Sequence, residues 1–210
     1  MFLQLRDVSF KYRSSGSYVL SNFNLDVNKG EIVSIVGLSG SGKSTVLRLL
    51  AGLEVPASGN ITINNKTMVN DSIFVQPERR NIGMVFQDYA LFPHLTVRQN
   101  IAFGIPHLSS QNRSNRVSEL LSLISMREYE ERYPHQLSGG QQQRVAVARA
   151  LAPNPHLLLM DEPFSNIDRA LKEKMRQEIR SILKAEHVTC IFVTHDATDV
   201  EDMSDRVIQL

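Results

Sequence analysis

The residues best suited to chemistry form a run of glycines, serines and one lysine between Gly37 and Thr45. The run reads Gly-Leu-Ser-Gly-Ser-Gly-Lys-Ser-Thr, and its spacing is that of a phosphate-binding P-loop. Glycines let successive backbone N–H groups point at one polyphosphate, and a helix N-terminus adds a favourable dipole. Lys43 would reach the β- and γ-phosphates, and the Ser44 hydroxyl would ligate Mg²⁺. The residues predicted to bind a nucleoside triphosphate are Gly37, Ser39, Gly40, Ser41, Gly42, Lys43, Ser44 and Thr45.

The elements that must position this loop are a strand before it and a helix after it. Residues 32–36 are an apolar, β-branched run typical of a buried strand. Residues 44–51 have the spacing of a helix that ends at Gly52. A flexible Gly/Ser turn is disfavoured because Lys-Ser stands between a strand and a helix. A dinucleotide-binding GxGxxG pattern fails because Thr45 replaces its last glycine.

A second chemical group lies at the end of another apolar run. Residues 157–160, Leu-Leu-Leu-Met, lead directly into Asp161 and Glu162. A buried strand of this kind delivers its last residues to the carboxyl edge of the sheet, beside the P-loop. Asp161 would hold Mg²⁺ through water, and Glu162 would orient or deprotonate an attacking water. A simple acidic strand end is the alternative, which the upstream P-loop disfavours.

The remaining pattern predicts a parallel α/β core interrupted by helices. Residues 88–152 have helical spacing, for example at Val117, Leu120, Leu121 and Ile124. Further strands are expected at 2–10, 19–27, 82–86, 188–194 and 206–210 and around Ile61 and Ile63, with a polar loop at 13–17 and a turn at 56–59. Helices are expected at 144–151 and around Leu171, Met175, Ile179 and Ile182, which are predicted to share one face.

Composition narrows the classes of protein that fit. The 210 residues are 42% hydrophobic and 21% charged, as in an ordinary globular protein. A net charge of +1 and the lack of any long Lys/Arg run give no reason to expect nucleic acid. Cys190 lies inside an apolar strand and is expected to be a buried small hydrophobe. There is no signal-peptide layout and no apolar stretch of about 20 residues, so a membrane role is expected to be peripheral.

The most specific further motif is Leu137-Ser138-Gly139-Gly140-Gln141. It resembles the signature pentapeptide of the ATP-binding cassette (ABC) ATPases, and the resemblance covers the whole chain. A serine and two glycines before a helix suit a second phosphate site, and one nucleotide needs only one P-loop. The resemblance implies that two chains pack head to tail, with these residues completing the partner's site. An ordinary Ser/Gly helix cap is the alternative.

The resemblance also assigns roles to four single residues. Tyr12 matches the aromatic that stacks on adenine, with a plain surface tyrosine as the alternative. Gln87 matches the glutamine that contacts Mg²⁺ or the attacking water. Asp168 ends the interface loop, here Ser-Asn-Ile-Asp where the family usually has Ser-Ala-Leu-Asp. His195 matches the switch histidine that contacts the γ-phosphate, although a lone histidine is more often structural.

The fold implied by the resemblance is α/β: a RecA-like P-loop NTPase core with an antiparallel β subdomain and an inserted α-helical subdomain. Residues 1–210 are expected to form a single ABC ATPase domain. In it, 1–87 and 153–210 make the core and β subdomain, and 88–152 make the helical signature subdomain. Such ATPases generally continue into a β-rich regulatory domain, which is expected to be absent from residues 1–210, either because the chain is truncated or because this is a natural short form.

Residues 76–97 resemble the bacterial importers of ferric iron, polyamines, sulfate and sugars, and are most similar to those for ferric iron. The implied function is ATP hydrolysis with ATP and Mg²⁺, in a dimer on integral membrane permease subunits served by a solute-binding protein. The implied location is the cytoplasmic face of the inner membrane. Alternatives are a soluble P-loop kinase or GTPase, and a non-transport ATPase that dimerises on ATP. The run Tyr89, Leu91, Phe92 and Pro93 suits permease docking or internal packing.

Overall fold

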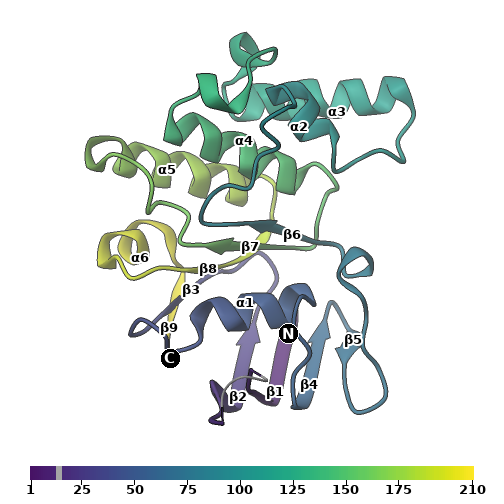
Figure 1. The fold of residues 1–210 in the computed structure, drawn as a ribbon, viewed down its shortest axis with the longest axis vertical. Coiled ribbons are helices and arrows are strands. Elements are labelled where there is room, and N and C mark those ends of the chain that lie inside the picture. The colour runs from purple at the N-terminus through teal and green to yellow at the C-terminus, as the bar shows by residue number, and fades with distance from the viewer. Residues whose placement is uncertain (13–15) are drawn as a thin grey trace.

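A parallel sheet of five strands carries the P-loop (Figure 1). The computed structural model describes residues 1–12 and 16–210, so most of the polar loop predicted at 13–17 lies outside the described residues. All four strand pairings in this sheet are parallel. The spatial order is β6 (Ile82–Val85), β7 (Leu157–Asp161), β8 (Thr189–Val193), β3 (Ile32–Val36) and β9 (Arg206–Gln209).

The central strands β3, β7 and β8 are buried on both faces, which explains their largely apolar sequences. In β7, Leu157 and Leu159 pack into one hydrophobic cluster, and Leu158 and Met160 pack into another. Cys190 in β8 is free and fully buried, as predicted, and burial raises the pKa of its thiol. The two faces of the sheet therefore support two separate layers of the molecule.

The first layer is an antiparallel sheet of four strands. Its spatial order is β2 (Leu20–Val27), β1 (Leu3–Phe10), β4 (Ser58–Ile63) and β5 (Lys66–Val69). The P-loop helix α1 (Lys43–Ala51) lies between this sheet and the parallel one, and its buried residues share one cluster with both (Figure 1). The helix is thus held from two sides directly behind the P-loop.

A buried arginine closes the far end of α1. Arg80 is 1% exposed, and its guanidinium donates to the carbonyls of Leu49 and Leu50, each at 2.8 Å. Burial lowers the pKa of Arg80 to about 10. Gly52 ends the helix with φ +81°, and a side chain there would meet the Arg80 Nε at 2.6 Å. These contacts fix α1 against the segment that leads into β6.

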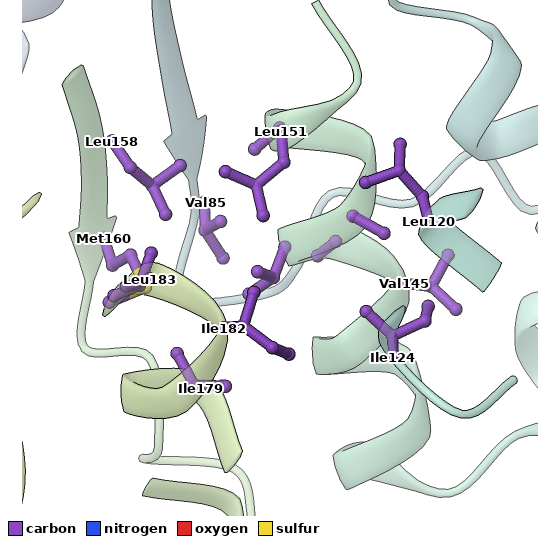
Figure 2. Close-up of a cluster of buried hydrophobic side chains, with 14 of the residues drawn as sticks. Val85, Leu120, Ile124, Val145, Leu151, Leu158, Met160, Ile179, Ile182 and Leu183 are labelled. Carbon is purple, nitrogen blue, oxygen red and sulfur yellow. The ribbon is translucent and has the colours of Figure 1, made fainter. Parts of the chain in front are cut away.

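The second layer consists of helices on the other face of the parallel sheet. Between β6 and β7 the chain forms α2 (Val97–Ala102), α3 (Ser110–Leu123) and α4 (Gly139–Leu151), and after β7 it forms α5 (Arg169–Ala185). Figure 2 shows side chains of α3, α4, α5 and the strands meeting in one cluster. This cluster joins the helix that follows the signature to the sheet that carries the P-loop.

Three predicted features differ in the structure, and several short elements were not individually predicted. Ser58 and Gly59, expected in a turn, belong to β4 because Ser58 pairs with Ser9. Leu171 is 46% exposed, whereas its three predicted helix partners are buried. The predicted helix from residue 144 begins earlier, at Gly139. They include β5 and α6 (Ala197–Met203), and also α2, which lies within the segment 88–152 that was predicted to be helical as a whole.

Acidic pH should weaken the anchoring of β3 through Asp205. Its carboxylate accepts the backbone N–H of Ile32 at 2.9 Å and pairs with Lys184 at 2.5 Å and Arg180 at 2.9 Å. Burial opposes ionisation, but these partners together hold the pKa of Asp205 below its usual value. A depressed folded-state pKa adds stability above the unfolded value of about 3.9, which is lost as pH falls through the folded value. Asp205→Asn should cost about 2 kcal/mol at pH 7 and flatten the acid decline.

Thermal unfolding of the parent and of Asp205→Asn between pH 7 and pH 2.5 measures the contribution of Asp205 to stability. Asp71→Asn, in the exposed loop after β5, is the matched control and should keep the parent's stability at pH 7. A decline of equal steepness in the parent and in Asp205→Asn would contradict the linkage.

Candidate functional site

The P-loop and the acidic end of β7 meet at the carboxyl edge of the parallel sheet. A cleft of about 410 Å³ opens there. The predicted residues that line it are Tyr12, Ser39, Gly40, Gly42, Lys43, Ser44, Thr45, Gln87, Glu162 and His195. Val19 and Arg48 also line it and were not predicted. Arg48 follows Thr45 by three positions in α1, and this helical spacing was the signal that could have found it.

The P-loop needs its glycines for both backbone shape and space. Gly40 and Gly42 have φ of +82° and +100°, which other residues rarely adopt. A side chain at Gly42 would also meet Val19 at 2.9 Å, and one at Gly37 would meet the Leu210 carbonyl at 2.5 Å. Substitution at these positions would therefore distort the loop itself.

The Lys43 side chain folds back onto the start of the P-loop. Its Nζ donates to the carbonyls of Gly37 at 3.0 Å and Leu38 at 2.9 Å. The N–H of Ser41 donates to the Leu38 carbonyl at 3.1 Å, which closes the turn. The ammonium group is thus held at the cleft together with the start of α1, where positive charge and helix dipole both favour an anion.

The predicted metal ligands come together at the same edge. The Ser44 hydroxyl donates to Asp161 Oδ1 at 2.8 Å, and the Gln87 side chain lines the same cleft. A hydroxyl and a carboxylate side by side are the hard oxygen ligands that Mg²⁺ prefers. The donor set in the structure therefore fits the predicted magnesium ion.

Glu162 and His195 form a pair across the cleft. His195 Nδ1 lies 2.9 Å from Glu162 Oε1, and the side chains are 72% and 16% exposed respectively. Glu162 has a left-handed backbone with φ +46°, rare for a residue with a side chain, and its N–H donates to the Val193 carbonyl at 3.0 Å. Backbone strain of this kind is characteristic of functional sites. A carboxylate and an imidazole thus line the same cleft as the P-loop lysine.

Tyr12 also lines the cleft and is half-buried. Its ring packs edge-on against Phe10 with centroids 4.8 Å apart. Its hydroxyl lies 3.1 Å from Thr45 Oγ1 and accepts from Arg48 at 3.4 Å. The structure therefore ties this tyrosine to the P-loop helix, and its stacking on adenine stays a prediction.

Three predicted segments contact one another within one chain: the loop at Gln87, the interface loop at Asn166 and the signature at Gly139. The Asn166 side chain donates to the Gln87 carbonyl at 2.9 Å. A side chain at Gly139 would meet the Asn166 carbonyl at 2.8 Å. Asp168 is exposed at the start of α5, and it is not among the described residues that line the P-loop cleft. Sequence reasoning did not find the contact made by Asn166.

The signature lies apart from the P-loop of its own chain. Ser138 caps α4: its Oγ accepts the Gln141 N–H at 3.3 Å, and Gln141 Oε1 accepts the Ser138 N–H at 2.9 Å. The alternative of a helix cap thus describes its local role correctly. Ser138, Gly140 and Gln141 line a separate cavity of about 310 Å³. Among the described residues that line the P-loop cleft, none comes from the signature.

The apolar run after Gln87 packs partly inside the protein. Tyr89 is 4% exposed, and Arg149 donates to the carbonyls of Tyr89 at 3.0 Å and Ala90 at 2.7 Å. Leu91 packs against the helical cluster, and Phe92 is half-buried beside Phe103. Internal packing therefore holds for Tyr89 and Leu91. No helix in the described part of the chain is long and apolar enough to cross a membrane.

Comparison with known proteins agrees with this geometry. The protein-family model for ABC transporters matches residues 20–165. The chain is similar to a solved dimeric ATP-binding cassette in a post-hydrolysis state bound to ADP and Pi. The TM-score is 0.84 at 35% identity, over 99% of this chain and 94% of that one. The predicted P-loop NTPase core with parallel and antiparallel sheets is thus confirmed.

Three curated relatives of the chain are named as transport or import ATP-binding proteins. The putrescine transport ATP-binding protein PotG of Escherichia coli K12 is 45% identical over 98% of this chain and 53% of its own length. The sulfate/thiosulfate import ATP-binding protein CysA of Synechocystis is 48% identical over 90% of this chain and 53% of its own length. The Fe(3+) ions import ATP-binding protein FbpC of Escherichia coli O157:H7 is 43% identical over 99% of this chain and 58% of its own length. The chain spans a little over half the length of these relatives. It belongs to the ABC transporter family, as the signature and the P-loop together predicted.

Proposed function

We propose that this chain is the ATP-binding and ATP-hydrolysing subunit of a bacterial ABC importer. The observation that carries the catalytic part is the pairing of Glu162 with His195 at 2.9 Å, on the cleft that Lys43 and Ser44 also line. This arrangement surrounds one volume with a phosphate-binding loop, a carboxylate and an imidazole. Such a combination suits hydrolysis of a terminal phosphate, in which positioning and charge stabilisation supply most of the catalysis.

Each residue then has a defined part in hydrolysis. Lys43 and the P-loop amides bind the phosphates. Ser44 with Asp161 would hold Mg²⁺, which when bound would offset the negative charge of the phosphate oxygens. Glu162 orients the attacking water and accepts its proton. His195 contacts the γ-phosphate and stabilises the charge that develops there.

The proposed active unit is a head-to-tail dimer. Two observations support it: the signature lies outside the P-loop cleft of its own chain, and a similar cassette has been solved as a dimer. In the dimer, Ser138 and the glycines after it would close over the γ-phosphate held by the partner, and Asp168 would lie at the interface. Each nucleotide would then be bound between two chains.

Replacing Ser138 tests this shared site. In a Glu162→Gln background, MgATP should convert monomer to dimer in light scattering, and Ser138→Arg should weaken dimerisation by at least about tenfold, or about 1.4 kcal/mol. A bulky cation would fill the helix N-terminus that is proposed to receive the partner's phosphate. ATP affinity of the monomer should not change.

The matched control is Ser109→Arg, because Ser109 caps α3 with the same 3.3 Å bond from a backbone N–H. This variant should lose its cap yet dimerise like the parent. Dimerisation of Ser138→Arg at the parent's affinity would exclude the signature from the shared site.

The proposed partners are integral membrane permease subunits and, through them, a solute-binding protein, with the chain peripheral on the cytoplasmic face of the inner membrane. The relatives named for transport or import support this assignment. The resemblance of residues 76–97 makes ferric iron the leading proposed cargo, ahead of polyamine, sulfate or sugar. Purification from membranes should recover the chain with its permease. Loss of the chain should reduce uptake of radiolabelled iron but not of putrescine or sulfate. Recovery with soluble partners alone would favour the non-transport ATPase.

A further inference from the structure

A buried polar network lies directly behind His195. The Thr194 hydroxyl donates to Asp199 Oδ2 at 2.7 Å, and Asp199 Oδ1 accepts from Arg176 at 3.0 Å. Arg176 also donates to Asp202 at 2.6 Å. Thr194 is fully buried, and Asp199 and Arg176 are 2% and 5% exposed. The network links the end of β8 to α6 and α5.

Thr194 connects this network to the backbone that presents the histidine. Its Oγ1 accepts the Asp196 N–H at 3.1 Å, so the hydrogen bond spans His195. The Thr194 N–H donates to the Ile35 carbonyl at 3.4 Å, on the strand that leads into the P-loop. The peptide groups on both sides of His195 are therefore fixed, although its ring is largely exposed.

The Thr194 hydroxyl accepts the Asp196 N–H because its single hydrogen is already donated to Asp199. A threonine hydroxyl has one O–H donor and two acceptor lone pairs. Donation to the buried carboxylate fixes the rotation of the hydroxyl and leaves a lone pair for the Asp196 N–H. Arg176 in turn holds the carboxylate through its second oxygen.

Stability alone does not account for this arrangement. Burying a carboxylate and a guanidinium is costly, and apolar residues in their place are often equally stable. One turn further along the same face of helix α5, Arg180 pairs with the far more exposed Asp205. The buried pair is thus a distinct feature, and its contact with the backbone of the cleft is through Thr194.

We propose that Asp199, held by Arg176, is a positioning residue that sets the Thr194 hydroxyl and thereby aims His195 at Glu162 and the cleft. The inference rests on the proposed catalytic role of His195. Thr194 and Asp199 touch no nucleotide in this scheme. They determine where the imidazole lies when the terminal phosphate is attacked, and a misplacement of about 1 Å can cost about a hundredfold in rate.

The test is steady-state ATP hydrolysis by Thr194→Val and Thr194→Ser. Valine keeps the shape and removes the hydroxyl, so kcat should fall about tenfold or more, with KM for MgATP within about twofold. Serine keeps the hydroxyl and should retain the parent rate. The matched control is Thr189→Val, at the opposite end of β8, where the hydroxyl accepts the Gly30 N–H at 3.0 Å. It should lower stability without changing kcat.

Combination with His195→Ala separates positioning from general damage. In that background Thr194→Val should lower the rate by less than about twofold, because there is no ring left to position. Full activity of Thr194→Val, equal kcat losses in Thr194→Val and Thr189→Val, or losses that multiply in the double variant would each overturn the proposal. Full activity of His195→Ala would instead remove the proposed role of His195, on which this inference depends.

Asp199→Asn provides a second variant if Thr194→Val does not fold by circular dichroism. Asparagine keeps the size of the side chain but loses the charge that pairs with Arg176. The same kcat loss, unchanged KM and lack of effect in the His195→Ala background are expected. A parent-like kcat for folded Asp199→Asn would exclude this carboxylate from the positioning of His195.

Discussion

Glu162→Gln is expected to lower kcat for ATP hydrolysis by about a hundredfold or more while ATP affinity stays within about twofold. Glutamine has the same shape but cannot accept a proton from the attacking water. The Glu162 side chain is mostly buried and lies against His195. Bulk solvent therefore cannot take over its role as proton acceptor. Phosphate release in single-turnover experiments, with nucleotide binding measured separately, checks both halves of the prediction.

The matched control for this change is Glu201→Gln, on the exposed side of α6. That variant should hydrolyse ATP at the parent rate. Hydrolysis at full rate by Glu162→Gln would remove this carboxylate from its assigned role and leave the P-loop assignment untouched.

Lys43→Ala should weaken binding of MgATP by about a hundredfold, which corresponds to about 3 kcal/mol. The lysine supplies a charge-assisted hydrogen bond to the phosphates from a position preset by the carbonyls of Gly37 and Leu38. Since the ammonium group sits at the edge of the cleft, its loss should leave the fold intact. Isothermal titration calorimetry gives the affinity directly, and circular dichroism confirms folding.

The comparison variant is Lys66→Ala, exposed on β5 of the antiparallel sheet. It removes the same charge far from the P-loop in sequence and should bind MgATP like the parent. Equal affinity of Lys43→Ala and the parent would contradict the phosphate-binding assignment.

The sequence predicted best those elements whose signals are local. The strand before the P-loop has the predicted bounds, 32–36, because a continuous apolar run between glycines needs no distant information. The short α2 and α6 have six and seven residues, too few for a clear helical period. For α2 a signal existed: Thr96 and Gln99 form a capping box.

The candidate site divides in the same way. Residues within a motif, such as Lys43 and Glu162, were predicted because the motif itself specifies their chemistry. Val19 and Asn166 were not, because their contacts join loops that are distant in sequence. The hydroxyl of Thr194 is another such case, since its partner Asp199 belongs to a helix that was not predicted.

The burial of Cys190 has a practical consequence for following the proposed dimer in solution. It is the only cysteine in the chain, and it is fully enclosed within β8. Thiol-reactive fluorophores or spin labels should therefore leave the native chain unmodified. A cysteine introduced at an exposed position such as Glu201 would be the single labelled point in each copy. Pulsed electron paramagnetic resonance could then measure the distance between the two labels and follow the approach of the two chains during a nucleotide cycle.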